Sequence, residues 1–231
     1  MTLHLQAATD RLLDTVDRLR DDAWSAPSRC TGWTRAHVVA HLALNAEALT
    51  GVLRGLQDGS PVPMYASDRS RDRDIDDLAA LAGTSTAAVR ERLRASAEAF
   101  AEVVAVAEGL PPGTTFDRTP GGRVMRASVV PLLRLREVEI HHADLDAGYS
   151  PSDWPPANAM AFLANDARVY RGPGFHAVAT DEPARWAFGQ PGVDAPTVSG
   201  PLGALAWWAT GRDPGPVLSS TNGTLPTMEG R

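Results

Sequence analysis

The chain has 231 residues, 43% of them hydrophobic, which is enough for a helical bundle followed by a smaller second domain, each with its own core. A net charge of −6 without a basic block excludes the usual electrostatic basis for binding nucleic acid, and a single cysteine excludes an intrachain disulfide and a multi-cysteine metal site. Charged residues occur early in the chain and no run of about 18 apolar residues follows, so the sequence predicts neither a secretory signal nor a membrane span, and therefore a cytoplasmic protein.

Two helices are predicted at the start of the chain. Residues 3–23 place apolar side chains at spacings of three and four, which is typical of an amphipathic bundle helix. Thr34 is the expected N-cap of a second helix, from about Arg35 to Leu56. In this helix Asn45 falls within the apolar stripe and His41 lies on its edge. Because burying either group unpaired costs about 1–3 kcal/mol, we expect both to have polar partners.

A loop, two helices and a hairpin are predicted next. Residues 59–70 contain two prolines and form a loop that could lie over a site. Helical periodicity covers residues 71–82 and, more strongly, residues 85–108. Proline and glycine clusters in residues 109–126 exclude a helix there and indicate a short hairpin or irregular crossover.

The central helix, from about Ala127 to Ala147, carries the clearest candidate site. Glu137 and His141 are i,i+4 neighbours on its face, close enough to bind one metal ion. Together with His41 they would form a set of two histidines and one glutamate with an open position, a ligand class suited to catalytic zinc. Spacing alone is weak evidence, because such a pair is more often a surface hydrogen bond.

Several neighbouring residues are possible substitutes for these ligands or supports for them. His37 could replace His41 and His142 could replace His141, but the phase of each helix disfavours both exchanges, and Glu139 lies off the Glu137 face. Two residues are candidates for supporting the ligands from behind, Asn45 and Asp144. For Asp144 the alternatives are an acceptor for the N–H of His141 and an exposed acid in the last helical turn.

The remaining polar residues give weaker signals. Cys30 has no flanking base and precedes Trp33, which we expect to be buried, so a packing role is favoured over a nucleophilic one. His4 and His176 have no informative context. Arg212 follows a helix rich in tryptophan, where it could complement the helix dipole or bind a carboxylate.

A linker rich in proline and serine, residues 150–156, predicts a boundary between a helical domain over 1–150 and an α+β domain over 151–231. The second domain is expected to consist of helices and short strands in this order: a helix at Ala157–Arg171, strands at Phe175–Thr180, Ala184–Phe188 and Thr197–Ser199, and a helix at Pro201–Thr210.

Four segments resemble the mycothiol-dependent maleylpyruvate isomerases, in the same order along the chain. They are Gly32–Leu42, the loop at Met64-Tyr65, Arg136–Leu145, and the Trp-x-Thr-Gly-Arg run that ends at Arg212. The resemblance implies a mainly helical protein, a DinB-like metal-binding four-helix bundle followed by a small α+β domain. It also implies a divalent metal, usually zinc, on His41, Glu137 and His141, and a catalytic Arg212 from the second domain that would hold a substrate carboxylate.

The activity implied by the resemblance is the cis–trans isomerisation of maleylpyruvate to fumarylpyruvate in gentisate catabolism, with mycothiol as a thiol cosubstrate. The chain has no convincing nucleophilic thiol of its own, which agrees with a borrowed one. Ala209, the doubled Trp207-Trp208 and the tail after Asn222 depart from the family pattern and leave the substrate more open than the fold. The alternatives are a mycothiol S-transferase for another electrophile and a non-catalytic metal- or ligand-binding bundle. The expected partners are small molecules only, and the expected state is a monomer.

Overall fold

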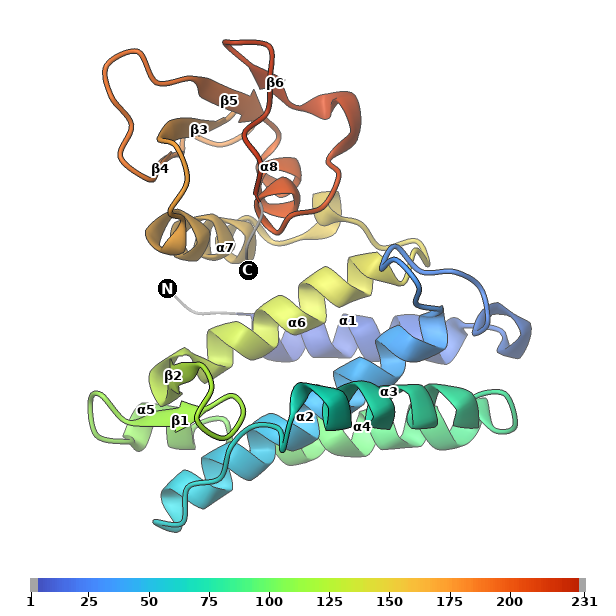
Figure 1. Cartoon of the computed structure of the whole chain (residues 1–231). Coiled ribbons are helices and arrows are strands. Elements are labelled where there is room, and N and C mark those ends of the chain that lie inside the picture. Colours follow the sequence, from blue (N-terminus) through green and yellow to red (C-terminus); the bar gives the residue numbers. More distant parts are fainter. Residues whose placement is uncertain (1–3, 229–231) are drawn as a thin grey trace. The chain divides into compact units, whose positions relative to one another are not determined.

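The computed structural model describes residues 4–228, which divide into two compact units (Figure 1). The first unit is His4–Gly148, and the second begins at Tyr149.

Long helices build the first unit. They are α1 (Leu5–Arg18), α2 (Arg35–Gln57), α3 (Asp68–Leu81), α4 (Thr86–Val103) and α6 (Val130–Asp144), with a short α5 (Val106–Gly109) and 3-10 turns η1 (Asp21–Ala23) and η2 (Ala127–Val129). Helix α2 contacts α3, α4 and α6, while α1 contacts α4 and α6. By length and composition α2 could also span a membrane, but most of its residues are buried, as in the core helix of a bundle.

Local sequence signals explain where α2 begins. The backbone N–H of Thr34 donates to His37 Nδ1 at 3.2 Å, which closes the first turn by a capping box. The apolar stripe predicted for this helix is buried from Val38 to Leu53, and Leu56 at its end is half-buried. The predicted start at Arg35 is confirmed, and His37 is held in the cap.

Other helices begin or end at residues that differ from those predicted by the apolar periodicity. The predicted helix over 3–23 ends at Arg18, because the backbone of Leu19 is extended, and the predicted helix over 85–108 breaks after Val103 into the separate α5. Helix α3 begins earlier than expected because Ser67 accepts a hydrogen bond from the backbone N–H of Ser70. The expected hairpin forms from β1 (Thr115–Asp117) and β2 (Val124–Arg126), which pair antiparallel.

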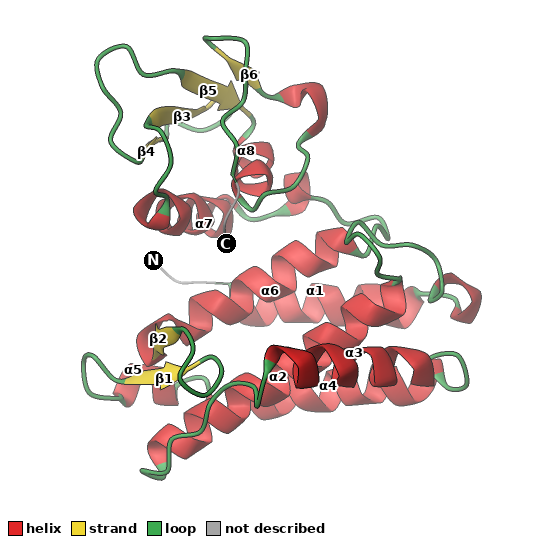
Figure 2. Cartoon of the chain, in the orientation of Figure 1, coloured by secondary structure: helices red, strands yellow, loops and turns green. Residues whose placement is uncertain are grey.

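The second unit combines helices with a small sheet (Figure 2). Its elements are η3 (Pro151–Asp153), α7 (Pro156–Val169), β3 (Phe175–Ala179), β4 (Arg185–Phe188), β5 (Thr197–Gly200), α8 (Leu202–Ala209), η4 (Gly215–Val217) and β6 (Ser219–Ser220). The strand order is β4-β3-β5-β6, in which only the β3–β5 pair is parallel. Stacked rings of Phe175 and Phe188, with centroids 4.6 Å apart, lie in its core. The short β6 was not predicted, because two serines carry no strand periodicity.

Candidate metal centre

The contact between α2 and α6 brings together three side chains that could bind one metal ion. His41 lies in the second turn of α2, and Glu137 and His141 lie one turn apart on α6. His41 Nε2 is 2.8 Å from Glu137 Oε2, and His141 Nε2 is 3.3 Å from the same oxygen. The three possible ligand atoms all lie within 4.8 Å of one another. The three residues singled out from the sequence, here called the triad, therefore meet between two helices.

Hydrogen bonds within the triad set its charges. Burial opposes ionisation of Glu137, but hydrogen bonds from His141 and His41 hold the pKa of its carboxyl well below its usual range. Burial also disfavours a charged His141, yet hydrogen bonds, the strongest of them to Asp144, raise its pKa well above its usual value. The pKa of His41 is lowered by burial. Before metal binding, the triad is thus a Glu137 carboxylate paired with a His141 imidazolium, beside a neutral His41.

Asp144 supports His141 from behind. Its carboxylate is fully buried, and Oδ2 lies 2.9 Å from His141 Nδ1. We assign a proton to Nδ1, because a carboxylate can only accept in this contact. This assignment leaves Nε2, the nitrogen that faces Glu137, as the ligand atom.

The donor set fits a divalent metal such as zinc. Two imidazole nitrogens and one carboxylate oxygen form the three-ligand class of catalytic zinc sites, in which a fourth position stays open. Zinc-binding histidines commonly donate their other ring N–H to a carboxylate, as His141 does to the buried Asp144. The side chain of Glu137 is 33% exposed, so the triad can be reached from solvent.

Metal binding is expected to release about one proton near neutral pH, because His141 must lose its Nε2 proton before that nitrogen can be a ligand. His141 is protonated below its raised pKa, so metal affinity falls as the pH falls. In the metal-free protein the raised pKa of His141 also stabilises the fold. This stabilisation is complete below the pKa of a histidine in the unfolded chain, about 6.5, and it is lost as the pH rises through the higher pKa of His141 in the folded protein. Calorimetric metal titrations in two buffers of different ionisation enthalpy count the protons. If almost no protons are released on metal binding at neutral pH, His141 is not an imidazolium in the metal-free protein.

Asp144→Asn is expected to weaken metal binding by about 10- to 100-fold, because an amide no longer fixes the tautomer and orientation of His141. Competition with a chromophoric chelator measures the affinity. Asp146→Asn is the matched control, since Asp146 is an exposed acid two residues further on that pairs with Arg29 at 2.7 Å. Equal losses in the two variants contradict the role given to Asp144.

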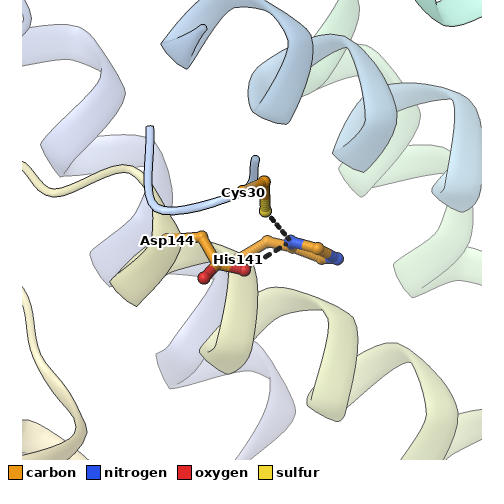
Figure 3. A group of neighbouring side chains, drawn as sticks. All are labelled: Cys30, His141 and Asp144. Carbon is orange, nitrogen blue, oxygen red and sulfur yellow. Dashed lines mark hydrogen bonds and ion pairs between the residues drawn. The ribbon is translucent and has the colours of Figure 1, made fainter. Parts of the chain in front are cut away.

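Cys30 lies closer to the site than its sequence context predicted (Figure 3). Its Sγ is 3.9 Å from His141 Nδ1, and Figure 3 shows the thiol and the Asp144 carboxylate directed at this same ring nitrogen. The sequence context of Cys30 did not show this contact, because the imidazole lies on a helix 111 residues further along the chain. The possible ligand atoms of Cys30, His141 and Asp144 also lie within 4.8 Å of one another. That set needs Nδ1 as the ligand atom, whereas the much shorter contact with Asp144 makes Nδ1 a donor.

The alternative ligands lie elsewhere. His37 caps α2, and its Nε2 is 3.7 Å from Asp76. His142 is buried, with Nε2 2.8 Å from Thr15 Oγ1. Glu139 is buried and accepts a hydrogen bond from Arg11 at 3.1 Å. Helix phase placed these residues off the triad face, and the structure agrees.

Two residues at the site were missed in the sequence. Arg134 is 1% exposed and donates to Asn45 Oδ1 at 2.9 Å, which makes Asn45 a partner of this arginine. Trp33 was expected to be buried but is half-buried. Its ring lies beside the triad, with its centroid 5.5 Å from that of His41 and 6.4 Å from that of His141. The phase of Arg134, three residues before Glu137, could have identified it.

Arg212 belongs to the second unit. Its guanidinium carbon lies 5.1 Å from the ring centroid of Trp207, and its Nη1 is 3.3 Å from Thr210 Oγ1. The tryptophan helix thus supports the guanidinium through a cation–π contact. His4 is exposed and His176 is half-buried on β3.

Comparisons with known proteins agree in pointing to one family. The family described as "Mycothiol maleylpyruvate isomerase N-terminal domain" matches residues 5–146. A crystal structure of the mycothiol-dependent maleylpyruvate isomerase is 25% identical, with a TM-score of 0.81, over 96% of this chain and 92% of that one. The structure of a histidine-to-alanine mutant of that isomerase has the same identity and coverage and a TM-score of 0.80. A search of curated protein sequences gave no match.

Proposed function

Because the chain belongs to the mycothiol maleylpyruvate isomerase family, we propose that it converts maleylpyruvate to fumarylpyruvate with mycothiol as its thiol cosubstrate. The observation that carries the proposal is the meeting of His41, Glu137 and His141 beside a buried Asp144. We propose that these three side chains hold a divalent metal, zinc, and that Asp144 orients His141.

The reaction needs a thiolate and a means of holding the substrate. Addition of the thiolate sulfur to the cis double bond, which is conjugated to a carbonyl, turns it into a single bond that can rotate, and expulsion of the same thiolate leaves the trans double bond. The thiol is therefore returned unchanged. When bound, a divalent metal supplies a Lewis acid that can lower the pKa of a thiol or polarise a carbonyl.

The side chains of this chain would then divide the remaining tasks. The ring of Trp33 lies beside His41 and His141 and would limit the access of water to the triad. Asp144 keeps the Nε2 of His141 directed at Glu137. Arg212 would bind a substrate carboxylate through two parallel N–H donors of its planar guanidinium. This geometry matches the two carboxylate oxygens better than the single ammonium of a lysine does.

An assay with the thiol present and absent tests the proposal. Purified protein is mixed with maleylpyruvate, with and without mycothiol, and the products are identified by absorbance and by mass. Thiol-dependent formation of fumarylpyruvate with recovery of free mycothiol supports the proposal. A product that retains the thiol indicates an S-transferase instead. Metal binding without turnover on maleylpyruvate or any other thiol-reactive electrophile indicates a non-catalytic binding protein.

We also propose that residues 1–150 and 151–231 are separate domains and that the enzyme is a cytoplasmic monomer. The division of the described chain at Gly148 and Tyr149 supports the first point. Light scattering of the purified protein tests the second, and a dimer mass contradicts it.

A further inference from the structure

A buried arginine extends the polar face of α6 beyond the triad. Arg134, Glu137, His141 and Asp144 follow one another at spacings of three, four and three, which places them on one side of the helix. Arg134 is 1% exposed, so its charge lies inside the helical unit.

Arg134 joins α6 to α2 next to the triad. Its Nη1 donates hydrogen bonds to the carbonyl oxygen of Leu42 and to Asn45 Oδ1, each at 2.9 Å. Leu42 directly follows His41, so this contact fixes the segment of α2 that carries a triad histidine. The other terminal nitrogen, Nη2, is buried without a hydrogen-bond partner.

The positive charge of Arg134 is not matched by a direct ion pair. No carboxylate of the described residues lies within 4.0 Å of its nitrogens. Burial lowers the pKa of Arg134 to about 10, so it stays protonated at neutral pH, and the nearby Glu137 acts in its favour. A buried, unpaired charge is costly to a fold.

Among the charges around the triad, the positive charge of Arg134 is the one that no negative charge balances. Glu137 and Asp144 carry one negative charge each and together balance one divalent cation on the triad. Two other arginines, Arg71 and Arg118, lie near the ring of Tyr65, but each has its own carboxylate: Arg71 pairs with Asp72 and Arg118 with Asp68. The loaded site thus has one positive charge more than it needs, which a single bound anion would neutralise.

We propose that Arg134 is a positioning residue that holds the α2 segment of the triad in place and gives the metal-loaded site its preference for an anionic ligand, the thiolate, over a neutral one. The inference rests on the metal site of the proposed function and deepens it. The metal's fourth coordination position would prefer an anionic ligand to a neutral one because of one buried side chain, which does not itself bind the metal.

Two ligands of different charge test this assignment. The full-length protein is loaded with Co²⁺ as a spectroscopic probe and titrated with thiocyanate, a monoanion, or with imidazole, a neutral ligand. Arg134→Gln is expected to weaken thiocyanate binding by about tenfold, because it removes one buried positive charge from the helix that carries Glu137 and His141. Imidazole binding is expected to change by less than about twofold, since a neutral ligand does not respond to the lost charge. Arg134→Lys, which keeps the charge, is expected to retain most of the thiocyanate affinity.

A matched control separates charge from packing. Arg90→Gln removes another arginine that bridges helices, since Arg90 donates to the carbonyl oxygens of Val16 and Leu19 and so ties α4 to α1, neither of which carries the triad. This variant is expected to leave both affinities unchanged. If Arg134→Gln does not fold, Arg134→Met provides the neutral variant.

The outcomes separate this inference from the proposed reaction. Equal weakening of thiocyanate and imidazole binding, or no change in either, overturns the charge preference assigned to Arg134. Loss of thiocyanate affinity alone in a protein that does not isomerise maleylpyruvate supports the inference and contradicts the proposed substrate. Failure of the wild-type protein to bind Co²⁺ or Zn²⁺ overturns both.

Discussion

His41→Ala is expected to abolish metal binding and to lower kcat/KM by about 10³-fold or more, because a bound metal contributes several kcal/mol to the stabilisation of charge in such reactions. His41 is the only triad member on α2, so its loss leaves an i,i+4 pair on α6 that cannot complete a three-ligand site. Elemental analysis after dialysis against a weak chelator measures the metal content, and steady-state kinetics with mycothiol and maleylpyruvate measures kcat/KM.

A second histidine on the same helix pair provides the control for this substitution. His142→Gln changes a buried histidine next to His141, whose Nε2 lies 2.8 Å from Thr15 Oγ1, outside the triad. It is expected to reduce stability through the altered contact with Thr15 while keeping one metal per chain. Retention of metal and activity by His41→Ala removes the triad as the site.

Arg212→Ala is expected to lower kcat/KM by about 10²-fold while the metal content stays at one per chain. A guanidinium that holds a substrate carboxylate contributes a charge-assisted, two-pronged hydrogen bond, and removal of one such donor set typically costs this much. The contacts of Arg212 with Trp207 and Thr210 keep the fork in a defined place within the second unit. Kinetics at several substrate concentrations separates an effect on KM from an effect on kcat.

Two further variants qualify the role of Arg212. Arg212→Lys keeps the charge but loses the fork and is expected to recover only part of the activity. Arg185→Ala removes an exposed arginine on β4 of the same unit and is expected to have no effect. An Arg212→Ala protein with wild-type kinetics excludes this side chain from substrate binding. Loss of metal instead assigns it a role in the stability of the site.

Local signals in the sequence were sufficient to place α2 and to pair Glu137 with His141. Thr34 marks the beginning of α2 because a side-chain cap is a contact within one turn. Glu137 and His141 share a face because the helical repeat fixes it. The ends of α1 and α4 were less predictable, because apolar periodicity continues past Arg18 and Val103 where the backbone turns away.

The contacts that complete the site join residues far apart in the chain, and only the tertiary structure decided them. His41 and Glu137 are 96 residues apart and Cys30 and His141 are 111 apart, yet each pair is in contact. Arg134 contacts its partners Leu42 and Asn45 on α2 in the same way, across 92 and 89 residues. The sequence by itself determined which face of each helix is polar, because short-range backbone geometry sets that face. Which polar faces meet depends on how the helices pack, and packing is decided by the burial of the whole apolar surface.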